Sequence, residues 1–134
     1  MILIDANVLM YAAGAPHPHK APSVALLEQV ASGTVEAVID AGVLQEVLHR
    51  YRAIHRWEEG KQVYDLARRI FPQVIPVTAE ILDRARQLLD ADATIMARDA
   101  LHAAVVMEEG LDGVCSYDQD FDRINGLVRR EPGA

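Results

Sequence analysis

The chain begins Met1-Ile2-Leu3-Ile4-Asp5-Ala6-Asn7, an apolar run that ends at an acid. A short run that is apolar at every position is typical of a strand buried on both faces of a parallel sheet. In an open parallel sheet, ligands bind in the crevice outside the carboxyl ends of the strands. We therefore expect Ile2–Ile4 to form a strand and Asp5 to lie at the functional edge of the sheet.

Further along the chain, short apolar runs alternate with segments of helical periodicity. The other expected strands are 37–39, 74–77, 113–116 and 127–129, and the expected helices are 5–11, 21–31, 43–53, 61–70, 79–89 and 98–109. This alternation predicts an α/β fold, a parallel sheet of about four to five strands with helices on both faces. Pro76 places strand 74–77 at a sheet edge or a strand end, because proline cannot donate to the ladder.

Length and composition predict one compact domain, residues 1–134. The chain is 51% hydrophobic, and a chain of this length buries roughly two-thirds of its unfolded surface. No apolar run approaches the ~20 residues of a membrane span, and Asp5 interrupts any signal-like core. The one cysteine, Cys115, excludes an internal disulfide framework and is typical of a reducing compartment. We expect a cytoplasmic protein with no membrane contact and with Cys115 packed in a strand.

Acids recur where strands are expected to end and in helices near that edge. Asp5 and Asp118 follow strands, whereas Glu46 and Asp99 lie inside or at the start of helices. Like charges gathered in this way raise one another's pKa unless something neutralises them. Because hard divalent cations choose oxygen ligands, a metal site is the leading hypothesis. Such a site would also account for much of the net charge of −7, which otherwise argues against binding nucleic acid.

Each acid also has an ordinary structural interpretation. Asp5 can cap the helix that follows it, and Asp99 can favour the positive end of a helix dipole. Glu46 lies outside the apolar stripe of its helix and can be a solvated surface acid. Asp40 follows a strand as Asp5 does, and there we expect a helix cap.

The run Asp118-Gln119-Asp120-Phe121-Asp122 superficially suggests an EF-hand loop. The glycine at the sixth position and the glutamate at the twelfth are both missing. Asp118 is therefore better interpreted as a strand-end ligand and Asp120 as a weaker second one. Asp122, beside Arg123, is expected at the surface.

Other motifs are absent or weak. The pair His17 and His19 lacks a third nitrogen or sulfur ligand nearby, which disfavours zinc. His102 lies three residues after Asp99 on the same helix face, where it either bonds a site carboxylate or has a structural role. The sequence contains no glycine-rich phosphate-binding motif, no GxSxG nucleophile elbow and no CxxC zinc motif. A phospho-receiver domain would need a lysine near the last strand, and no lysine follows Lys61.

Taken in order, several stretches resemble PIN-domain ribonucleases, and specifically the VapC toxins of toxin–antitoxin pairs. The matching stretches are Ile2-Leu3-Ile4-Asp5-Ala6-Asn7, Leu44-Gln45-Glu46-Val47, Arg98-Asp99-Ala100-Leu101-His102-Ala103-Ala104 and Ser116-Tyr117-Asp118-Gln119-Asp120-Phe121-Asp122. The resemblance spans nearly the whole chain. It departs from the family at Ser116, where relatives often carry Thr, and at Asp40, where they often carry Ser or Thr.

The resemblance implies a catalytic quartet of Asp5, Glu46, Asp99 and Asp118 that holds Mg²⁺ or Mn²⁺. Asp5, Asp99 and Asp118 would be the principal metal ligands, and Glu46 would complete the site or position the attacking water. Supporting roles fall to Asn7, Ser116 and Asp120. The implied reaction is hydrolysis of an RNA phosphodiester to a 5′-phosphate and a 3′-hydroxyl, with metal-activated water. Sequence-selective RNA recognition usually targets unstacked loops, so a structured RNA with a defined loop is the expected substrate.

The resemblance also implies a homodimer and a cognate antitoxin that covers the site. Residues 51–70, with Trp57 and Tyr64, are a candidate partner surface because aromatic residues are enriched at interfaces, although ordinary core packing explains them equally well. The alternative to a toxin ribonuclease is a catalytically silent PIN-like domain that acts only as a binding or regulatory partner.

Overall fold

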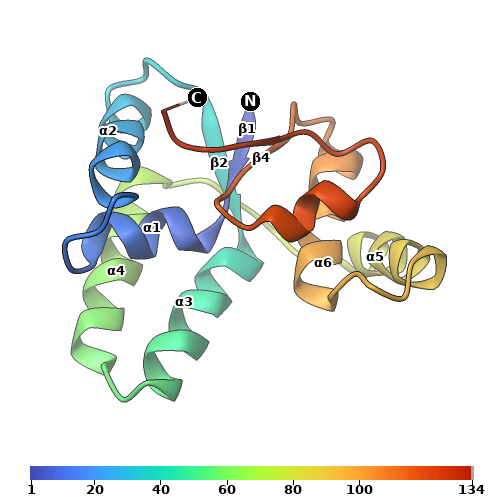
Figure 1. The fold of residues 1–134 in the computed structure, drawn as a ribbon, viewed down its shortest axis with the longest axis horizontal. Helices are drawn as coiled ribbons and strands as arrows, with labels where there is room; N and C mark the ends of the chain where they lie inside the picture. Colours follow the sequence, from blue (N-terminus) through green and yellow to red (C-terminus); the bar gives the residue numbers. More distant parts are fainter. Residues whose placement is uncertain (134) are drawn as a thin grey trace.

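The computed structural model describes residues 1–133 and has an α/β fold with a parallel sheet (Figure 1). Its strands are β1 (Ile2–Ile4), β2 (Ala37–Asp40), β3 (Val74–Ile75), β4 (Val114–Cys115) and β5 (Arg129–Arg130). They are arranged in the order β3-β2-β1-β4-β5, and each neighbouring pair is parallel. The expected parallel α/β fold is confirmed.

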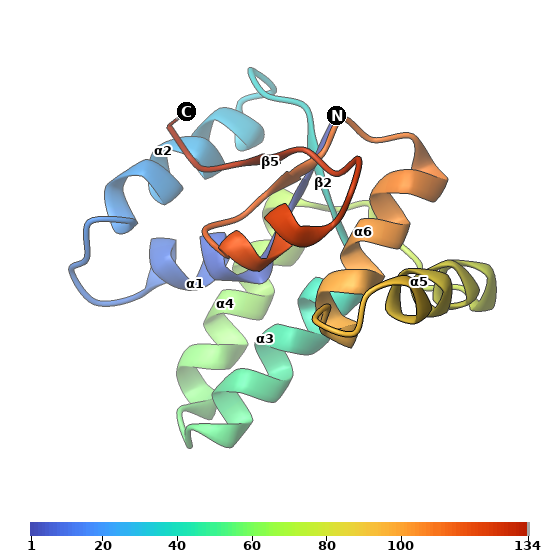
Figure 2. The ribbon, with the colours of Figure 1, turned by 45° about the vertical axis from the view of Figure 1, so that its right-hand side comes forward.

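Helices cover both faces of the sheet. They are α1 (Ala6–Ala13), α2 (Lys20–Ala31), α3 (Ala41–Ala53), α4 (Trp57–Ile70), α5 (Ala79–Ala91) and α6 (Ala97–Glu109), and a 3₁₀ helix, η1 (Gln119–Arg123), follows β4. Figure 2 shows α3 and α4 as a pair of helices that extends away from the sheet. Within residues 1–133, no helix combines the length and the apolar character that crossing a bilayer requires.

Each face of the sheet has its own apolar core, because successive side chains of a strand point to opposite faces. The core shared with α5 and α6 takes Leu3, Val38 and Val114 from the central strands. The core shared with α1 to α4 takes the next residue of each strand, namely Ile4, Ile39 and Cys115. Burial on both faces explains why these strands are apolar at every position. The expected packing of Cys115 in a strand is confirmed.

The strand order creates a switch point between β1 and β4. From β1 the chain moves outward to β2 and β3, and β4 then returns on the other side of β1. The backbone N–H of Asp5 donates to the carbonyl of Cys115 at 3.0 Å, which holds the ends of these two strands together. In open parallel sheets the crevice outside such a point is the usual ligand site.

The structure corrects the expected bounds of α4. This helix begins at Trp57, four residues before the expected Lys61. Glu58 and Glu59 lie in its first turn, where the helix dipole favours acids. Gly60 does not interrupt the helix because it packs on α3: a Cβ atom there would lie 2.5 Å from Cβ of Tyr51. The small residue therefore allows the two helices to approach closely.

Two further expectations were wrong at the residue level. The last strand is Arg129–Arg130 rather than 127–129, because Leu127 packs against the core on the α6 side and the ladder begins where Arg129 pairs with Val114. The helical periodicity of residues 79–89 predicts an apolar face that includes Leu82, but this side chain is 49% exposed in α5. Strand β3 does lie at the sheet edge, as Pro76 predicts.

Candidate active site

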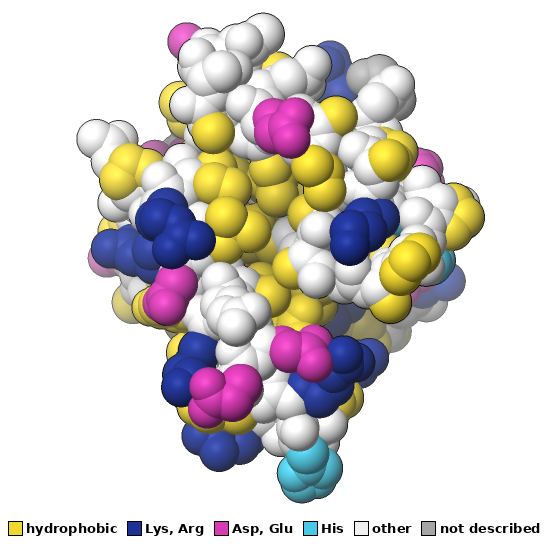
Figure 3. All heavy atoms as spheres, turned by 90° about the vertical axis from the view of Figure 1, so that its left-hand side faces the viewer, with side chains coloured by type: hydrophobic (Ala, Val, Ile, Leu, Met, Phe, Trp, Pro, Cys, Tyr) yellow, Lys and Arg dark blue, Asp and Glu magenta, His cyan; other side chains and the backbone are white. Residues whose placement is uncertain are grey.

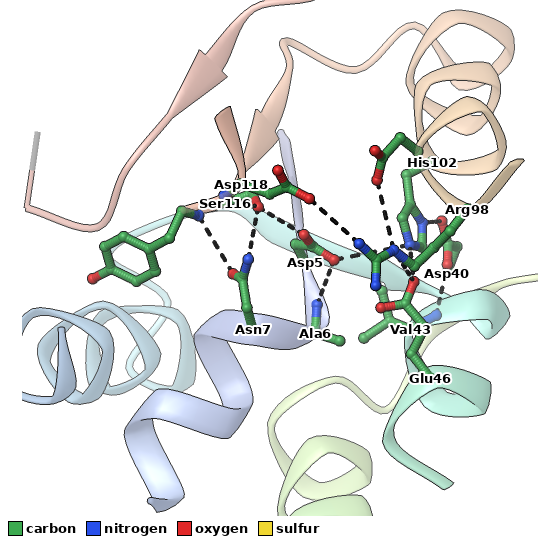
Figure 4. Close-up of polar contacts among 12 residues, drawn as sticks. Asp5, Ala6, Asn7, Asp40, Val43, Glu46, Arg98, His102, Ser116 and Asp118 are labelled. Atoms are coloured by element: carbon green, nitrogen blue, oxygen red, sulfur yellow. Dashed lines mark hydrogen bonds and ion pairs between the residues drawn. The ribbon is translucent and has the colours of Figure 1, made fainter. Parts of the chain in front are cut away.

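Acidic side chains from distant parts of the chain meet beyond the carboxyl ends of β1, β2 and β4 (Figure 4). Carboxylate and imidazole atoms of Asp5, Glu46 and His102 lie within 4.8 Å of one another. The oxygens of Asp99, Asp118 and Asp120 form a second group under the same limit. The structure thus brings all four members of the expected quartet to this edge, divided between two neighbouring groups.

Asp5 is fixed by its own helix and by the end of β4. Its Oδ1 atom accepts a hydrogen bond from the backbone N–H of Ala6 at 2.7 Å, as a cap of α1 does. Its Oδ2 atom accepts from the hydroxyl of Ser116 at 2.7 Å. The cap interpretation of Asp5 and its place in the acidic cluster are therefore compatible.

Ser116 connects three parts of the site. Besides donating to Asp5, its Oγ atom accepts from the Asn7 side-chain amide and from the backbone N–H of Asp118, each at 3.0 Å. Ser116 is fully buried. Asn7 and Ser116 thus position the carboxylates of Asp5 and Asp118, which is consistent with the supporting roles expected of them.

His102 joins Asp40 to Glu46. Its Nδ1 atom lies 2.7 Å from Asp40 Oδ2 and its Nε2 atom lies 2.6 Å from Glu46 Oε1. Although burial lowers the pKa of His102, the hydrogen bonds to the two carboxylates raise it to about 10. The ring is therefore an imidazolium that donates from both nitrogens, and it has no lone pair to offer a metal.

This arrangement settles three expectations. The solvated interpretation of Glu46 is wrong, because its side chain is only 15% exposed and accepts from His102. The cap interpretation of Asp40 is confirmed, since its Oδ1 atom accepts from the backbone N–H of Val43 at 2.9 Å. For His102, the alternative in which it bonds a site carboxylate is confirmed.

Asp99 lies in the first turn of α6 and is buried. Its Oδ1 atom is enclosed and has no hydrogen-bond partner among residues 1–133. Burial raises the pKa of Asp99, and the nearby Asp118 raises it further, to about 6, against the lowering effect of Arg98. A buried carboxylate oxygen without a partner is costly unless something compensates it.

Asp118 and Asp120 lie at the start of η1, a helix the sequence did not predict. Asp118 Oδ1 accepts from the backbone N–H of Asp120 at 2.9 Å and so caps this short helix. Asp120 is 48% exposed and forms an ion pair with Arg123 at 3.6 Å. Asp122 is at the surface as expected, and it pairs with Arg129.

Arg98 lies at the site, although no sequence pattern predicted a role for it. Its guanidinium lies 3.3 Å from Asp118 Oδ2, 3.6 Å from Asp99 Oδ1 and 3.9 Å from Glu46 Oε1. Although burial lowers the pKa of Arg98, the negative charges of the nearby carboxylates, Glu46 first among them, outweigh that effect and raise the pKa above its ordinary value. Arg98 lies in the first turn of α6, where the helix dipole disfavours a positive charge. This unfavourable position is the feature of the sequence that could have pointed to a role for Arg98.

The residues present fit a hard divalent cation. The group formed by Asp99, Asp118 and Asp120 offers carboxylate oxygens alone, the ligands that Mg²⁺ and Mn²⁺ prefer. Within the described residues, the buried Asp99 Oδ1 has its lone pairs free. By contrast, His17 and His19 belong to neither group of three or more candidate metal ligands found among the described residues.

A groove of about 870 Å³ begins at this cluster. Asp5, Glu46 and Arg98 line it at the cluster, and Arg50 and Arg56 are also among its lining residues. The planar guanidinium group of arginine can donate two parallel hydrogen bonds to one phosphate group. The groove therefore combines an acidic centre with basic side chains, although the whole chain is acidic.

Comparisons with known proteins agree on the family. Residues 2–127 match the model of the PIN domain. The chain is 41% identical over 129 residues to Ribonuclease VapC13 of Mycobacterium tuberculosis, covering 96% of this chain and 98% of the relative. It is 31% identical over 118 residues to Ribonuclease VapC23 of the same species, covering 88% and 93%.

Solved structures share the fold. VapC20 of Mycobacterium tuberculosis, described as a Sarcin-Ricin loop cleaving toxin, superposes with a TM-score of 0.77 at 17% identity, covering 96% of this chain and 97% of that one. VapBC2 from Rickettsia felis, solved bound to a DNA fragment from its promoter, gives a TM-score of 0.76 at 20% identity, covering 98% of both chains. The chain belongs to the PIN domain family and, within it, to the VapC group.

Proposed function

We propose that this protein is a metal-dependent endoribonuclease that acts as the toxin of a toxin–antitoxin pair. The observation that carries the proposal is the buried, unpartnered Oδ1 atom of Asp99, a residue whose carboxylate is grouped with those of Asp118 and Asp120. The VapC relatives support the activity, because two of them, at 41% and 31% identity, are ribonucleases by name. The catalytic roles of Asp5, Glu46, Asp99 and Asp118 are part of this proposal.

Asp99 and Asp118 would hold Mg²⁺ or Mn²⁺, with Asp5 from the neighbouring group and Asp120 at the exposed side. When bound, such a cation acidifies a water molecule and stabilises negative charge on the attacked phosphate and the leaving oxygen. Glu46 would orient the attacking water, because its Oε1 atom is fixed by His102 and its other oxygen remains available. Asp5 would keep its geometry through Ala6 and Ser116. The products would carry a 5′-phosphate and a 3′-hydroxyl.

The substrate class we propose is a structured RNA with an exposed loop. Arg50 and Arg56 line the groove that leads to the acidic cluster, where they can contact the phosphates on either side of the cut. Unstacked loop nucleotides enter such a groove more readily than paired ones do. The description of VapC20 as cleaving the Sarcin-Ricin loop is consistent with this substrate class.

We also propose a cognate antitoxin and a homodimer. Figure 3 shows apolar side chains gathered in a depression on the face of the molecule that carries α2 and α4. Half-buried apolar residues of α1, α2 and α4 include Met10, Leu26, Val30, Tyr64 and Ile70. Tyr51, which belonged to the expected partner surface, is core, and Trp57 is stacked against Arg52 at 4.3 Å. Light scattering of the protein with and without a co-expressed antitoxin tests both partners.

The decisive experiment measures cleavage of total RNA and of a loop-containing RNA with Mg²⁺, with Mn²⁺ and with chelator. We expect cleavage that requires metal and is abolished in the Asp5→Asn and Asp99→Asn variants. Asp122→Asn is the matched control, because Asp122 is an exposed acid near the site that pairs with Arg129. Cleavage insensitive to chelator and to both substitutions would reject the proposal. Metal binding without cleavage of any RNA would favour the binding-only alternative.

A further inference from the structure

Arg98 bridges the two groups of acids. It is the second residue of α6, and it contacts carboxylates that come from α3, from its own helix and from the segment after β4. Figure 4 shows its guanidinium between Asp118 and Glu46, facing Asp5. The side chain is 57% exposed, so it reaches the cluster from the solvent side.

The same oxygens are the expected ligands of a divalent cation. Arg98 approaches Oδ1 of Asp99, the unpartnered buried atom, at 3.6 Å, which is too far for a hydrogen bond. It also approaches Asp118 Oδ2 at 3.3 Å. A cation bound between these atoms would lie beside a full positive charge, so the two cations exclude each other by repulsion.

The contacts of Arg98 with the carboxylates are weak enough for a divalent cation to replace them. Its shortest contact with an acid of the cluster is 3.3 Å, and exposed ion pairs of this length contribute little stability. Its place in the first turn of α6 opposes the helix dipole. His102, by comparison, is 1% exposed and bonds its two carboxylates at 2.6 and 2.7 Å. His102 is therefore a permanent cation of the site, whereas Arg98 can leave.

We propose that Arg98 is a built-in counter-cation that occupies the acidic cluster in the metal-free protein and is displaced when a divalent cation binds. Arg98 thereby lowers the apparent metal affinity and keeps the carboxylates close together until metal arrives. The inference rests on the metal site of the proposed function and adds a regulator to it. It concerns the affinity for metal, which is measured without any RNA.

The first test is calorimetric titration of the purified full chain with MnCl₂ and with MgCl₂. Removing the competing charge in Arg98→Gln should tighten binding by about tenfold, within the usual range of coupling between two ligands. Arg86→Gln is the matched control: Arg86 is an exposed arginine of α5 that pairs with Asp90, outside the groove and the acidic cluster. Its metal affinity should stay within about twofold of wild type. Arg98→Lys keeps the positive charge but replaces the planar guanidinium by an ammonium group on a shorter side chain. Its metal affinity should lie between those of wild type and Arg98→Gln.

The second test follows Arg98 itself in the wild-type protein, so it does not depend on a variant that folds. The Nε–H resonance of Arg98, assigned by its absence in Arg98→Gln, should shift when saturating Mg²⁺ is added. An unchanged resonance would overturn the inference, as would equal or weaker metal binding by Arg98→Gln or no metal binding by any form.

These outcomes separate the inference from the proposed function. Tighter binding by Arg98→Gln in a protein that cuts no RNA keeps the inference and rejects the ribonuclease. Metal-dependent RNA cleavage combined with an unchanged metal affinity in Arg98→Gln supports the ribonuclease and rejects the inference about Arg98.

Discussion

The Oδ2 atom of Asp40 lies 2.7 Å from Nδ1 of His102, and this contact fixes the proton state of the histidine. Because the other ring nitrogen faces the carboxylate of Glu46, both nitrogens must donate. Asp40 therefore acts on the site through His102, although its own Oδ1 atom caps α3. Asp40, His102 and Glu46 form a chain of two charge-assisted hydrogen bonds that orients the glutamate.

The stability of the metal-free protein should depend on pH through His102. Since its folded-state pKa of about 10 lies above the ordinary value of 6.5, its stabilising contribution is complete below pH 6.5 and is lost as pH rises toward 10. In His102→Gln this part of the pH dependence should disappear, and the variant should be about 3 kcal/mol less stable at pH 7. Urea denaturation in EDTA between pH 6 and 10 measures both effects. Parallel profiles for the two proteins would contradict the prediction.

Asp99→Asn should stabilise the metal-free protein while it abolishes metal binding. The pKa of Asp99, raised to about 6, means that its ionised form destabilises the fold fully above pH 6 and not at all below its ordinary value of 3.8. Asparagine removes that cost, which is roughly 2–3 kcal/mol at pH 8. Denaturation at pH 8 in EDTA provides the measurement. A less stable Asp99→Asn protein would show that the carboxylate is compensated within the fold.

Metal affinity should fall as the pH is lowered through 6. Protons compete with the cation for Asp99, whose pKa is about 6 in the metal-free protein, and metal binding therefore releases protons. Titrations with Mg²⁺ at pH 5.5, 6.5 and 7.5, in buffers that differ in ionisation enthalpy, count the protons released. We expect affinity to be nearly constant above pH 7 and proton release to rise toward one proton per bound cation as the pH falls below 6. Affinity that does not change between pH 5.5 and 7.5 would contradict this expectation.

Ser116→Ala should weaken catalysis without changing the fold. The hydroxyl donates to Asp5 and accepts from Asn7 and from the backbone of Asp118, so its loss leaves buried groups without partners. Activity should fall by about 10- to 100-fold, with a loss of about 1–2 kcal/mol in the free energy of unfolding. Ser116→Thr keeps the hydroxyl and should stay close to wild type. Equal losses in both variants would show that the hydroxyl is not the cause.

The sequence by itself determined where β1 ends and which acids follow β1 and β4. An apolar run that ends at Asp5, and another that ends shortly before Asp118, predict the direction of the backbone, and parallel strands bring the residues at their carboxyl ends to one edge. This is local information, because it depends on side-chain alternation and backbone direction within a few residues. The arrival of Glu46 and Asp99 at the same edge needed the family resemblance in addition.

Only the tertiary structure decided how these acids are neutralised. Asp40, Glu46 and His102 lie in β2, α3 and α6, and no local pattern predicts that one imidazole bonds both carboxylates. Arg98 and the unpartnered Asp99 Oδ1 atom likewise depend on how α6 packs against its neighbours. The physical reason is that proton state and ion pairing depend on burial and on partners distant in sequence, whereas the end of a strand depends on its own residues.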